Sequence, residues 1–435
     1  MQDSLVWKGL KVSRRRSWTV SIMSREFLVN EYGVGSVIDE EDLRAATEAL
    51  RYSESLSWGP RVPMFERAFA DYCGAKHAVA VTSCTAALEI ATRILKIRSR
   101  DEIVGTPQTF RATYVPVNAA GAAINFADIE AETLDIDPGT IEGKITTKTK
   151  AIYVMHYGGN PVDMDPIIEI AEKHGLAIVE DAAHALGTVY KGRKVGSIGD
   201  LTCFSLQSLK NMTTLGEGGF LTTNRDDYAE MARTLRTYGI IGERKPRIEK
   251  RIGNYLAPDP RISDHSDGSW DYDWVRIDGW GIHARMNEVQ AAVGLNQLKK
   301  LDRMNEMRAK VAEWYSEGLS KIPGIRLWKI REKSRCSWHL YPCFIDQRRI
   351  RVNMFDLIHH LELEKKIRII PRYFPVHLTD YMRYYGHGYG ECPVCERVWF
   401  EEQLNLPINP RMPYSEVEVV IEAVNEGLEK MRKTP

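Results

Sequence analysis

The residues with the clearest chemical potential follow short apolar runs of the sequence. A carboxylate and an imidazole come first, because Asp181 ends the run 177–181 (AIVED) and His184 lies three residues further on. An amine follows the run 201–206 (LTCFSL), where Lys210 precedes a glycine-rich segment. A lone lysine normally faces solvent, and a carboxylate that ends a buried strand either caps a helix or is buried with a partner. Each of these residues is therefore a weak indication by itself, and only their combination predicts a functional site.

A third run, 77–83 (HAVAVTS), leads directly into Thr85 and Ala86 at the start of a predicted helix. Free backbone N–H groups and the helix dipole make such a start a binding place for phosphate. Small hydroxyl residues at this position also serve as plain helix caps, which is their commoner role. Ser205, at the end of the run 201–206, adds another hydroxyl.

Together these groups form the set that pyridoxal phosphate requires. The cofactor needs a lysine amine for its Schiff base, an acid opposite its pyridinium nitrogen, and donors for its phosphate. The acid keeps the ring nitrogen protonated, so that the ring can accept electrons when a substrate loses its α-proton. The sequence thus predicts a pyridoxal-phosphate site in which Lys210 and Asp181 are the catalytic residues.

The elements that must position these residues alternate regularly along the chain. Short β-branched and apolar runs predict seven strands, at 77–83, 102–106, 122–128, 151–156, 177–181, 201–206 and 218–223. Helix-compatible segments separate or follow most of them, at 85–96, 109–120, 166–174 and 226–237. This alternation is typical of a largely parallel sheet covered by helices on both faces. Ligands of such sheets gather at the carboxyl ends of the strands, where the candidate residues lie.

The remaining sequence suggests the domain organisation. We expect residues 23–310 to comprise an N-terminal segment and the large α/β domain, and residues 311–435 to form a smaller C-terminal α+β domain. The spacing of apolar residues over 284–320 predicts a long amphipathic helix. The basic stretch 1–22 lacks the apolar core of a secretory signal and is expected to be a disordered extension. The charged segment 240–275 is expected to be a long loop.

Composition narrows the class of protein. The chain has 435 residues, 43% hydrophobic and 27% charged, as is ordinary for a soluble globular protein. Lys plus Arg and Asp plus Glu both number 59, so the balanced charge argues against nucleic acid or an anionic membrane as the partner. No run is long and apolar enough to span a bilayer. Seven cysteines are too few, and odd in number, for a disulfide scaffold, which favours a cytoplasmic protein.

Longer sequence blocks resemble the DegT/DnrJ/StrS family of pyridoxal-phosphate sugar aminotransferases. The blocks are GTPQTFRATYVPVNAAGA, EDAAHALGTVYKGRKVGSIGD, CFSLQSLKNMTTLGEGG, GIHARMNEVQAAVGLNQLKKLD, SWHLYPCFI, FPVHL and CPVCERV. Their order and spacing are far more specific than any single motif. The resemblance implies the fold-type-I aminotransferase fold and a homodimer whose active sites lie at the subunit interface.

The resemblance also implies individual roles. Lys210 would form the Schiff base, Asp181 would pair with the pyridinium nitrogen, and His184 would contact the ring's 3-hydroxyl oxygen or stack near it. Phe110 would cover one face of the ring. The remaining implied contacts are Thr85, Ala86 and Ser205 to the phosphate, and Tyr341, His377 and Arg285 near the substrate.

This chain departs from the family pattern at two positions. Cys84 stands where many members have glycine between the serine and threonine of the phosphate-binding turn. His283 stands where the family usually has an asparagine that reaches the phosphate of the neighbouring subunit. We therefore expect His283 to approach the partner's cofactor site.

A zinc site is the weaker interpretation of the cysteines. Cys392 and Cys395 form a single CxxC pair, and the family block that contains them binds no metal. Cys336 and Cys343 would complete four ligands, but structural zinc sites usually show two compact pairs. No metal is expected.

Three functions remain open from the sequence. The leading one is amino transfer from glutamate or glutamine to a keto sugar, nucleotide-linked in most of the family, with a keto cyclitol as the close alternative. A sugar dehydratase of the same fold would replace the Schiff-base lysine with histidine, which Lys210 argues against. A non-catalytic regulatory protein is the third, and the intact set of Asp181, Ser205 and Lys210 argues against it.

The expected substrate wall is aromatic. It comprises Trp338, His339, Tyr341, Tyr373, Phe374 and His377. Such side chains suit a polyhydroxylated ring, which favours stacking and neutral hydrogen bonds. Arg111 and Arg372 are candidates for the donor's carboxylate or a phosphate of the acceptor.

Overall fold

The computed structural model describes residues 27–30, 35–239 and 280–432. The expectations for the extension 1–22 and for the loop 240–275 fall on residues outside these ranges.

The centre of the molecule is one seven-stranded sheet in the order β1-β9-β8-β5-β4-β2-β3. The strands are β1 (His77–Val81), β2 (Glu102–Gly105), β3 (Ala123–Phe126), β4 (Thr149–Met155), β5 (Ala177–Asp181), β8 (Leu201–Ser205) and β9 (Gly219–Thr223). Only β9 runs antiparallel to its neighbours in this sheet, β1 and β8. All seven predicted strands are present, and the prediction of a mostly parallel α/β sheet is confirmed.

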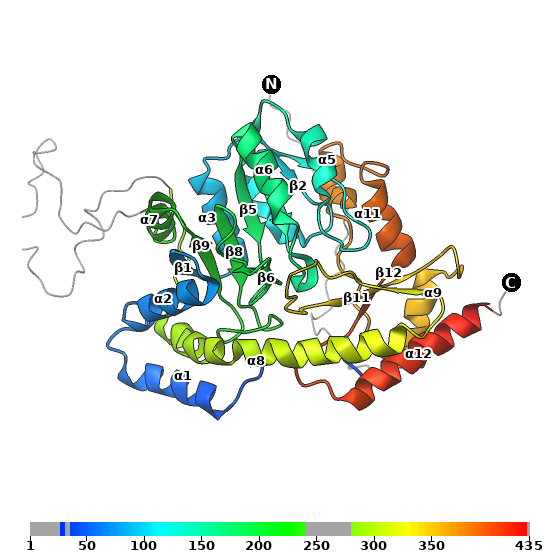
Figure 1. The fold of residues 1–435 in the computed structure, drawn as a ribbon. Coiled ribbons are helices and arrows are strands. Elements are labelled where there is room, and N and C mark those ends of the chain that lie inside the picture. Colours follow the sequence, from blue (N-terminus) through cyan, green and yellow to red (C-terminus); the bar gives the residue numbers. More distant parts are fainter. Residues whose placement is uncertain (1–26, 31–34, 240–279, 433–435) are drawn as a thin grey trace, which may run out of the picture.

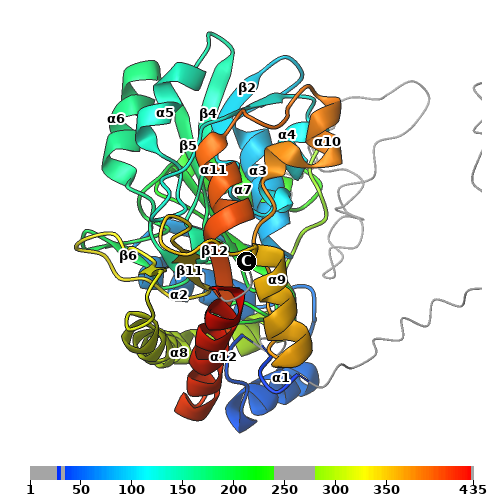
Figure 2. The ribbon, with the colours of Figure 1, turned by 90° about the vertical axis from the view of Figure 1, so that its right-hand side faces the viewer.

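Helices cover both faces of the sheet, as Figure 2 shows for α3 and α4 on one side and α6 on the other. Apolar side chains alternate between the two faces of β1: Val79 and Val81 lie in a core cluster with α3, and Ala78 and Ala80 lie in the cluster with α2. The helices of this domain are α1 (Glu40–Tyr52), α2 (Arg61–Cys73), α3 (Cys84–Ile94), α4 (Val115–Ala119), α5 (Pro138–Ile141), α6 (Met164–His174) and α7 (Asp226–Leu235). A small hairpin joins β6 (Val189–Tyr190) and β7 (Arg193–Lys194).

The helix predicted over 109–120 is broken into two short pieces. A 3₁₀ turn spans Arg111–Thr113, and α4 spans Val115–Ala119 with Pro116 in its first turn. Proline has no N–H and fixes its own φ, so it is tolerated only at the start of a helix. The break places Thr113 close to the end of β5, which matters for the active site.

One long helix, α8 (Glu288–Leu319), runs along the base of the molecule from α1 and α2 toward α12 (Figure 1). The sequence predicts it over 284–320. It begins later because Asn287 caps it by accepting from the N–H of Gln290. The expected domain boundary at 310 falls inside this helix. Leu301 packs in the core of the large domain, whereas Tyr315 packs in the core of the small one.

The small domain is built on a three-stranded antiparallel sheet, β10 (Ile325–Leu327), β11 (Tyr341–Ile345) and β12 (Gln403–Leu406). Its helices are α9 (Met354–His359), α10 (Asp380–Tyr384), α11 (Pro393–Arg397) and α12 (Tyr414–Arg432). Strand β11 begins only at Tyr341. The preceding residues instead dock on a glycine turn of the large domain, where the His339 N–H donates to the Gly158 carbonyl.

Candidate active site at the carboxyl edge of the sheet

The candidate residues for chemistry converge at one edge of the sheet. Strands β1, β5 and β8 point the same way, so Thr85, Asp181 and Ser205 all lie at or just beyond their carboxyl ends. Lys210 follows β8 by five residues. The fold therefore gathers these groups at the strand ends, where the sequence places them.

Asp181 is a buried acid held by hydrogen bonds. Its carboxylate accepts from the Thr113 hydroxyl at 2.6 Å and from the Ala183 N–H at 3.0 Å. The Cys84 thiol lies 3.8 Å from the same carboxylate, as a weak donor. Burial raises the pKa of Asp181, whereas these hydrogen bonds and the charge of Lys210 lower it and only partly offset the burial. An acid in this state is stabilised by a cation placed against it.

Lys210 is half-buried and its charge is poorly solvated. The pKa of Lys210 is lowered to about 8, chiefly by burial and in part by the nearby Arg372 guanidinium, whereas the charge of Asp181 raises it. Its Nζ lies 3.5 Å from His339 Nε2. A lysine near this pKa is largely available as a neutral amine at slightly alkaline pH, which a nucleophilic amine requires.

The hydrogen bonds of His184 define its protonation. Its Nδ1 accepts from the Gly158 N–H at 3.2 Å, so the proton of the neutral ring lies on Nε2, 2.9 Å from the Tyr373 hydroxyl. Burial lowers the pKa of His184 well below its usual value, and the charge of Lys210 lowers it further. His184 is therefore a neutral donor in this site.

The start of α3 is closely packed against the sheet. Ser83 caps the helix, and its hydroxyl accepts from the Ala86 N–H at 3.1 Å. Ser83 is therefore the helix cap of this segment. Thr85 and Ala86 lie in the first turn of the helix, at the positive end of its dipole. Gly219 lies beneath this turn, where an added Cβ would overlap the Ser83 carbonyl carbon. The buried Ser205 provides a hydroxyl at the end of β8.

These groups fit pyridoxal phosphate. A buried acid that gains from a cationic partner suits the pyridinium nitrogen, and a lysine with a lowered pKa suits covalent attachment of an aldehyde. A helix start beside a serine hydroxyl suits the phosphate. Phe110 provides an open aromatic side chain, 46% exposed and tilted against Tyr373 at 5.5 Å between ring centroids.

His283 and Arg285 lie on a surface segment beside β1. Residue 285 bridges to Val81, and the exposed His283 ring stacks on Tyr238 at 5.0 Å. Arg285 places one guanidinium nitrogen 3.3 Å from His283 Nε2. The His283 ring is exposed at the molecular surface.

Two residues expected near the substrate are core residues instead. Tyr341 is buried, bonds to the Ser316 hydroxyl at 2.9 Å and stacks on Trp338. His377 is fully buried and pairs with Glu396 at 2.8 Å. Both fall in blocks rich in aromatic and polar residues, but burial against their own neighbours leaves them no surface for a substrate. The sequence pattern could not distinguish a pocket wall from packing.

The structure adds hydrogen-bond partners that no sequence motif indicates. Thr113 holds Asp181, and Asn211, directly after Lys210, lies 3.2 Å from His339 Nδ1 through its Oδ1 atom. His339 was expected only as part of an aromatic wall. The adjacency of Asn211 to the lysine was the one available signal.

The structure shows the state of the cysteines and the arrangement of the potential metal ligands. All seven cysteines are buried free thiols. Within the described ranges, His, Cys, Asp and Glu side chains form no group of three or more arranged for a metal ion. In the same ranges, no helix combines the length and apolarity that a membrane span needs.

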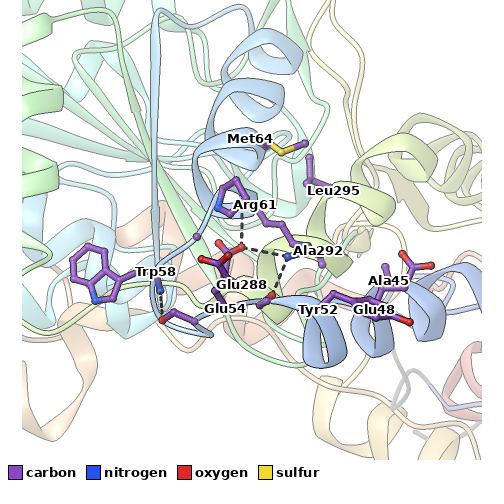
Figure 3. Close-up of a pocket in the computed structure, with 14 residues that line it drawn as sticks. Ala45, Glu48, Tyr52, Glu54, Trp58, Arg61, Met64, Glu288, Ala292 and Leu295 are labelled. Carbon is purple, nitrogen blue, oxygen red and sulfur yellow. Dashed lines mark hydrogen bonds and ion pairs between the residues drawn. The ribbon is translucent and has the colours of Figure 1, made fainter. Parts of the chain in front are cut away.

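A separate surface pocket of about 660 Å³ lies between α1, α8 and the segment that joins α1 to α2 (Figure 3). Glu288 points toward Arg61 within it, and its carboxylate accepts from the N–H groups of Arg61 and Val62 at 3.1 and 3.0 Å, which caps α2. The rim carries two exposed aromatic side chains, Tyr52 at 73% and Trp58 at 55% exposure, among polar residues such as Glu48 and Glu54. The Arg285 guanidinium lies 4.1 Å above the Trp58 ring, so this rim continues into the His283 segment.

Comparisons with known proteins agree with this geometry. The chain is 38% identical over 391 residues to the spore coat polysaccharide biosynthesis protein SpsC of Bacillus subtilis, covering 90% of this chain and 95% of that one. It is 31% identical to a UDP-4-amino-4,6-dideoxy-N-acetyl-beta-L-altrosamine transaminase of Campylobacter jejuni, covering 91% and 97%. The solved structure of S. venezuelae DesV, in complex with a ketimine intermediate, is 32% identical with a TM-score of 0.76, covering 89% and 94%. The model of the DegT/DnrJ/EryC1/StrS aminotransferase family matches residues 36–425, and the chain belongs to this family.

Proposed function

We propose that this aminotransferase uses pyridoxal phosphate to move an amino group from glutamate or glutamine to a keto sugar. The acceptor that we favour is a nucleotide-linked keto sugar. The observation that carries the proposal is that Lys210 and Asp181 lie together at the carboxyl edge of the sheet. The charge of each acts on the pKa of the other, so the amine and the acid share one site. The Lys210 side chain also separates this site from the dehydratases, in which histidine takes that position.

When bound, pyridoxal phosphate supplies an electron sink for the α-carbon of the amino acid. Lys210 would hold the cofactor covalently and, when displaced by the donor's amine, would carry the proton at the reacting carbon. Asp181 would stay ionised against the ring nitrogen, with its orientation fixed by Thr113. The start of α3 and the Ser205 hydroxyl would bind the phosphate.

Arg372 is the strongest candidate for the donor's carboxylate. Its positive charge acts on Lys210, His184 and His339, so its guanidinium lies close to all three. The Tyr157 hydroxyl donates to its backbone carbonyl at 2.5 Å, which fixes the chain at this position. A planar guanidinium matches two carboxylate oxygens, as glutamate and glutamine both offer.

The sugar acceptor is supported by the relatives and by the exposed aromatic side chains. Of the relatives compared above, one is named for spore coat polysaccharide biosynthesis and another is named as an amino-sugar transaminase. Phe110 and Phe374 are the exposed aromatic side chains beside Tyr373. Such surfaces stack on the apolar face of a sugar ring, and a keto cyclitol offers a similar face.

The surface around the pocket between α1 and α8 supports a homodimer. The exposed Trp58 ring on the rim of this pocket contacts Arg285, which in turn contacts His283. A second copy that covers this rim would bring His283 toward the neighbouring active site. Exposed apolar patches bordered by polar groups are typical of such interfaces.

We place the enzyme in the cytoplasm. All seven cysteines are free and buried, as suits a reducing compartment.

A panel assay tests the function. The purified enzyme is loaded with pyridoxal phosphate and given glutamate or glutamine alone, and conversion of the cofactor to its amine form is followed by absorbance. The acceptors are then nucleotide-linked 3- and 4-keto sugars, free keto sugars and inosose-type cyclitols. Transfer only to simple 2-oxo acids would overturn the sugar proposal, and no conversion with either donor would overturn the aminotransferase activity itself.

A further inference from the structure

The segment that carries His339 belongs to the small domain but is fixed to the active-site edge of the large one. The His339 N–H donates to the Gly158 carbonyl at 2.8 Å. A Cβ on Gly159 would overlap the Ser337 hydroxyl, so the close approach of the two segments depends on glycine. Trp338 has φ +52°, a left-handed conformation that is unfavourable for a bulky residue. A strained residue held by its surroundings is a common feature of functional sites.

A chain of amide hydrogen bonds fixes the ring of His339. Asn305 donates its Nδ2 to the Leu186 carbonyl at 2.8 Å, so its Oδ1 faces Asn211, whose Nδ2 donates to it at 2.8 Å. The same Nδ2 also donates to the Ser337 carbonyl at 2.7 Å. These two hydrogen bonds fix the orientation of the Asn211 amide, so that its oxygen points at His339.

The remaining contact of the His339 ring is with the Lys210 amine. Because the Asn211 Oδ1 accepts at 3.2 Å, the proton of a neutral His339 lies on Nδ1. The other nitrogen, Nε2, then presents its lone pair to the Lys210 amine, 3.5 Å away. Contacts of catalytic groups are often long in the unliganded state and shorten when the site is filled.

We propose that His339 is a positioning residue for Lys210: its Nε2 accepts a hydrogen bond from the amine, with the tautomer fixed by Asn211 and Asn305. A neutral amine has two N–H bonds and one lone pair, so holding one N–H limits rotation about the Cε–Nζ bond and aims the lone pair. This inference rests on the proposed role of Lys210.

The surroundings keep the His339 ring neutral, as an acceptor must be. Burial lowers the pKa of His339 well below its usual value, and the neighbouring His184, Lys210, Arg308 and Arg372 lower it further. The groups that act electrostatically on Lys210 itself are Asp181, Cys84 and Arg372.

Two substitutions separate positioning from packing. His339→Gln places an amide near the Nε2 position and can still accept from Lys210. His339→Asn reaches only the Nδ1 position, so it keeps the contact with Asn211 and loses the one with Lys210. If His339 only filled space, the position of the hydrogen-bonding atom in the replacement side chain would make no difference.

The first measurement uses the cofactor-free protein. Acetylation of Lys210 is followed by peptide mass spectrometry as a function of pH. His339→Asn should lower the pKa of Lys210 by about half to one unit, because an acceptor that stabilises the ammonium form is lost, and His339→Gln should retain most of the wild-type value. In the loaded enzyme, half-transamination should slow about tenfold in the His339→Asn variant and less in the His339→Gln variant. Identical behaviour of the two folded variants would overturn the proposal.

A second measurement needs no substitution at His339. In protein labelled with ¹⁵N-histidine, Lys210→Met should shift the unprotonated Nε2 signal of a histidine that carries its proton on Nδ1. A response confined to histidines protonated on Nε2 would show that Lys210 does not contact His339. Borohydride labelling of the wild-type protein with pyridoxal phosphate distinguishes the two failures, because a label on another lysine would overturn the role of Lys210 and not that of His339 alone.

Discussion

His184 and His339 lie with their ring centroids 4.2 Å apart and hold their protons on opposite nitrogens. His184 accepts from the Gly158 N–H at Nδ1, and His339 faces the Asn211 oxygen with the equivalent atom. One ring therefore offers a donor to the site and the other an acceptor. Burial keeps both rings neutral by lowering the pKa of each, so the pair surrounds Lys210 without adding positive charge.

Lys210 is expected to be the covalent attachment point of the cofactor. Protein loaded with pyridoxal phosphate should be yellow, and borohydride reduction followed by peptide mapping should place the label on Lys210. Lys210→Ala should still bind the cofactor but should not turn over, because the amine that moves the proton is gone. A label on a different lysine contradicts this assignment.

The same lysine should make stability depend on pH in the cofactor-free protein. Burial lowers the pKa of Lys210 from 10.5 to about 8, so between these values the unfolded chain binds a proton that the folded chain has lost. Stability of the wild type should therefore rise with pH in this window relative to Lys210→Met. Urea denaturation of both proteins from about pH 7 to the upper end of this window measures the difference. A constant difference across the window would show that Lys210 is not poorly solvated.

Asp181→Asn should weaken cofactor binding about a hundredfold and slow transamination further. Removing the anion costs about 2–3 kcal/mol in a buried charge-assisted bond, and more where charge develops in the transition state. Asp135→Asn is the matched control, because Asp135 is also a buried carboxylate but lies 3.8 Å from Arg331 and away from the end of β5. Cofactor titration and the half-reaction with glutamate provide the measurements. Near wild-type activity of the Asp181→Asn variant would assign the electron sink to another acid.

Gly219→Ala should displace the start of α3. The added Cβ would overlap the Ser83 carbonyl carbon, so the turn must shift, at a cost of about 1–3 kcal/mol. Cofactor affinity should fall with stability, because the same turn is the proposed phosphate site. Gly143→Ala, where a Cβ meets no atom within 4 Å, should leave both nearly unchanged. Thermal unfolding of the two variants with and without pyridoxal phosphate provides the measurement. If the cofactor stabilises both variants equally, the α3 turn does not bind the cofactor.

Mixing two inactive variants tests whether the active site is shared between subunits. If His283 acts on the partner's site, Lys210→Ala and His283→Ala homodimers should both lose activity. Their hybrid should regain part of it, because one site then carries both intact residues. Subunit exchange is first shown with differently tagged proteins. No recovery after demonstrated exchange would place His283 outside the neighbouring site.

Local patterns in the chain were sufficient to predict the sheet and the principal candidate residues. Alternating β-branched runs and helices leave few arrangements other than a mostly parallel sheet, because each strand must be buried on both faces. Lys210, Asp181 and Ser205 could be found because they follow such runs, and parallel strands bring their carboxyl ends to one edge. Local rules also located α8, although the Asn287 cap moved its start by four residues.

Which polar and aromatic residues face the site depends on the folded chain. Tyr341 and His377 match expected pocket positions in sequence, yet both are buried against partners from distant segments, Ser316 and Glu396. His339 reaches Lys210 because the Gly158 turn holds a small-domain segment against the large domain. Burial and hydrogen-bond partners depend on contacts between residues far apart in the chain, and no local pattern encodes those contacts.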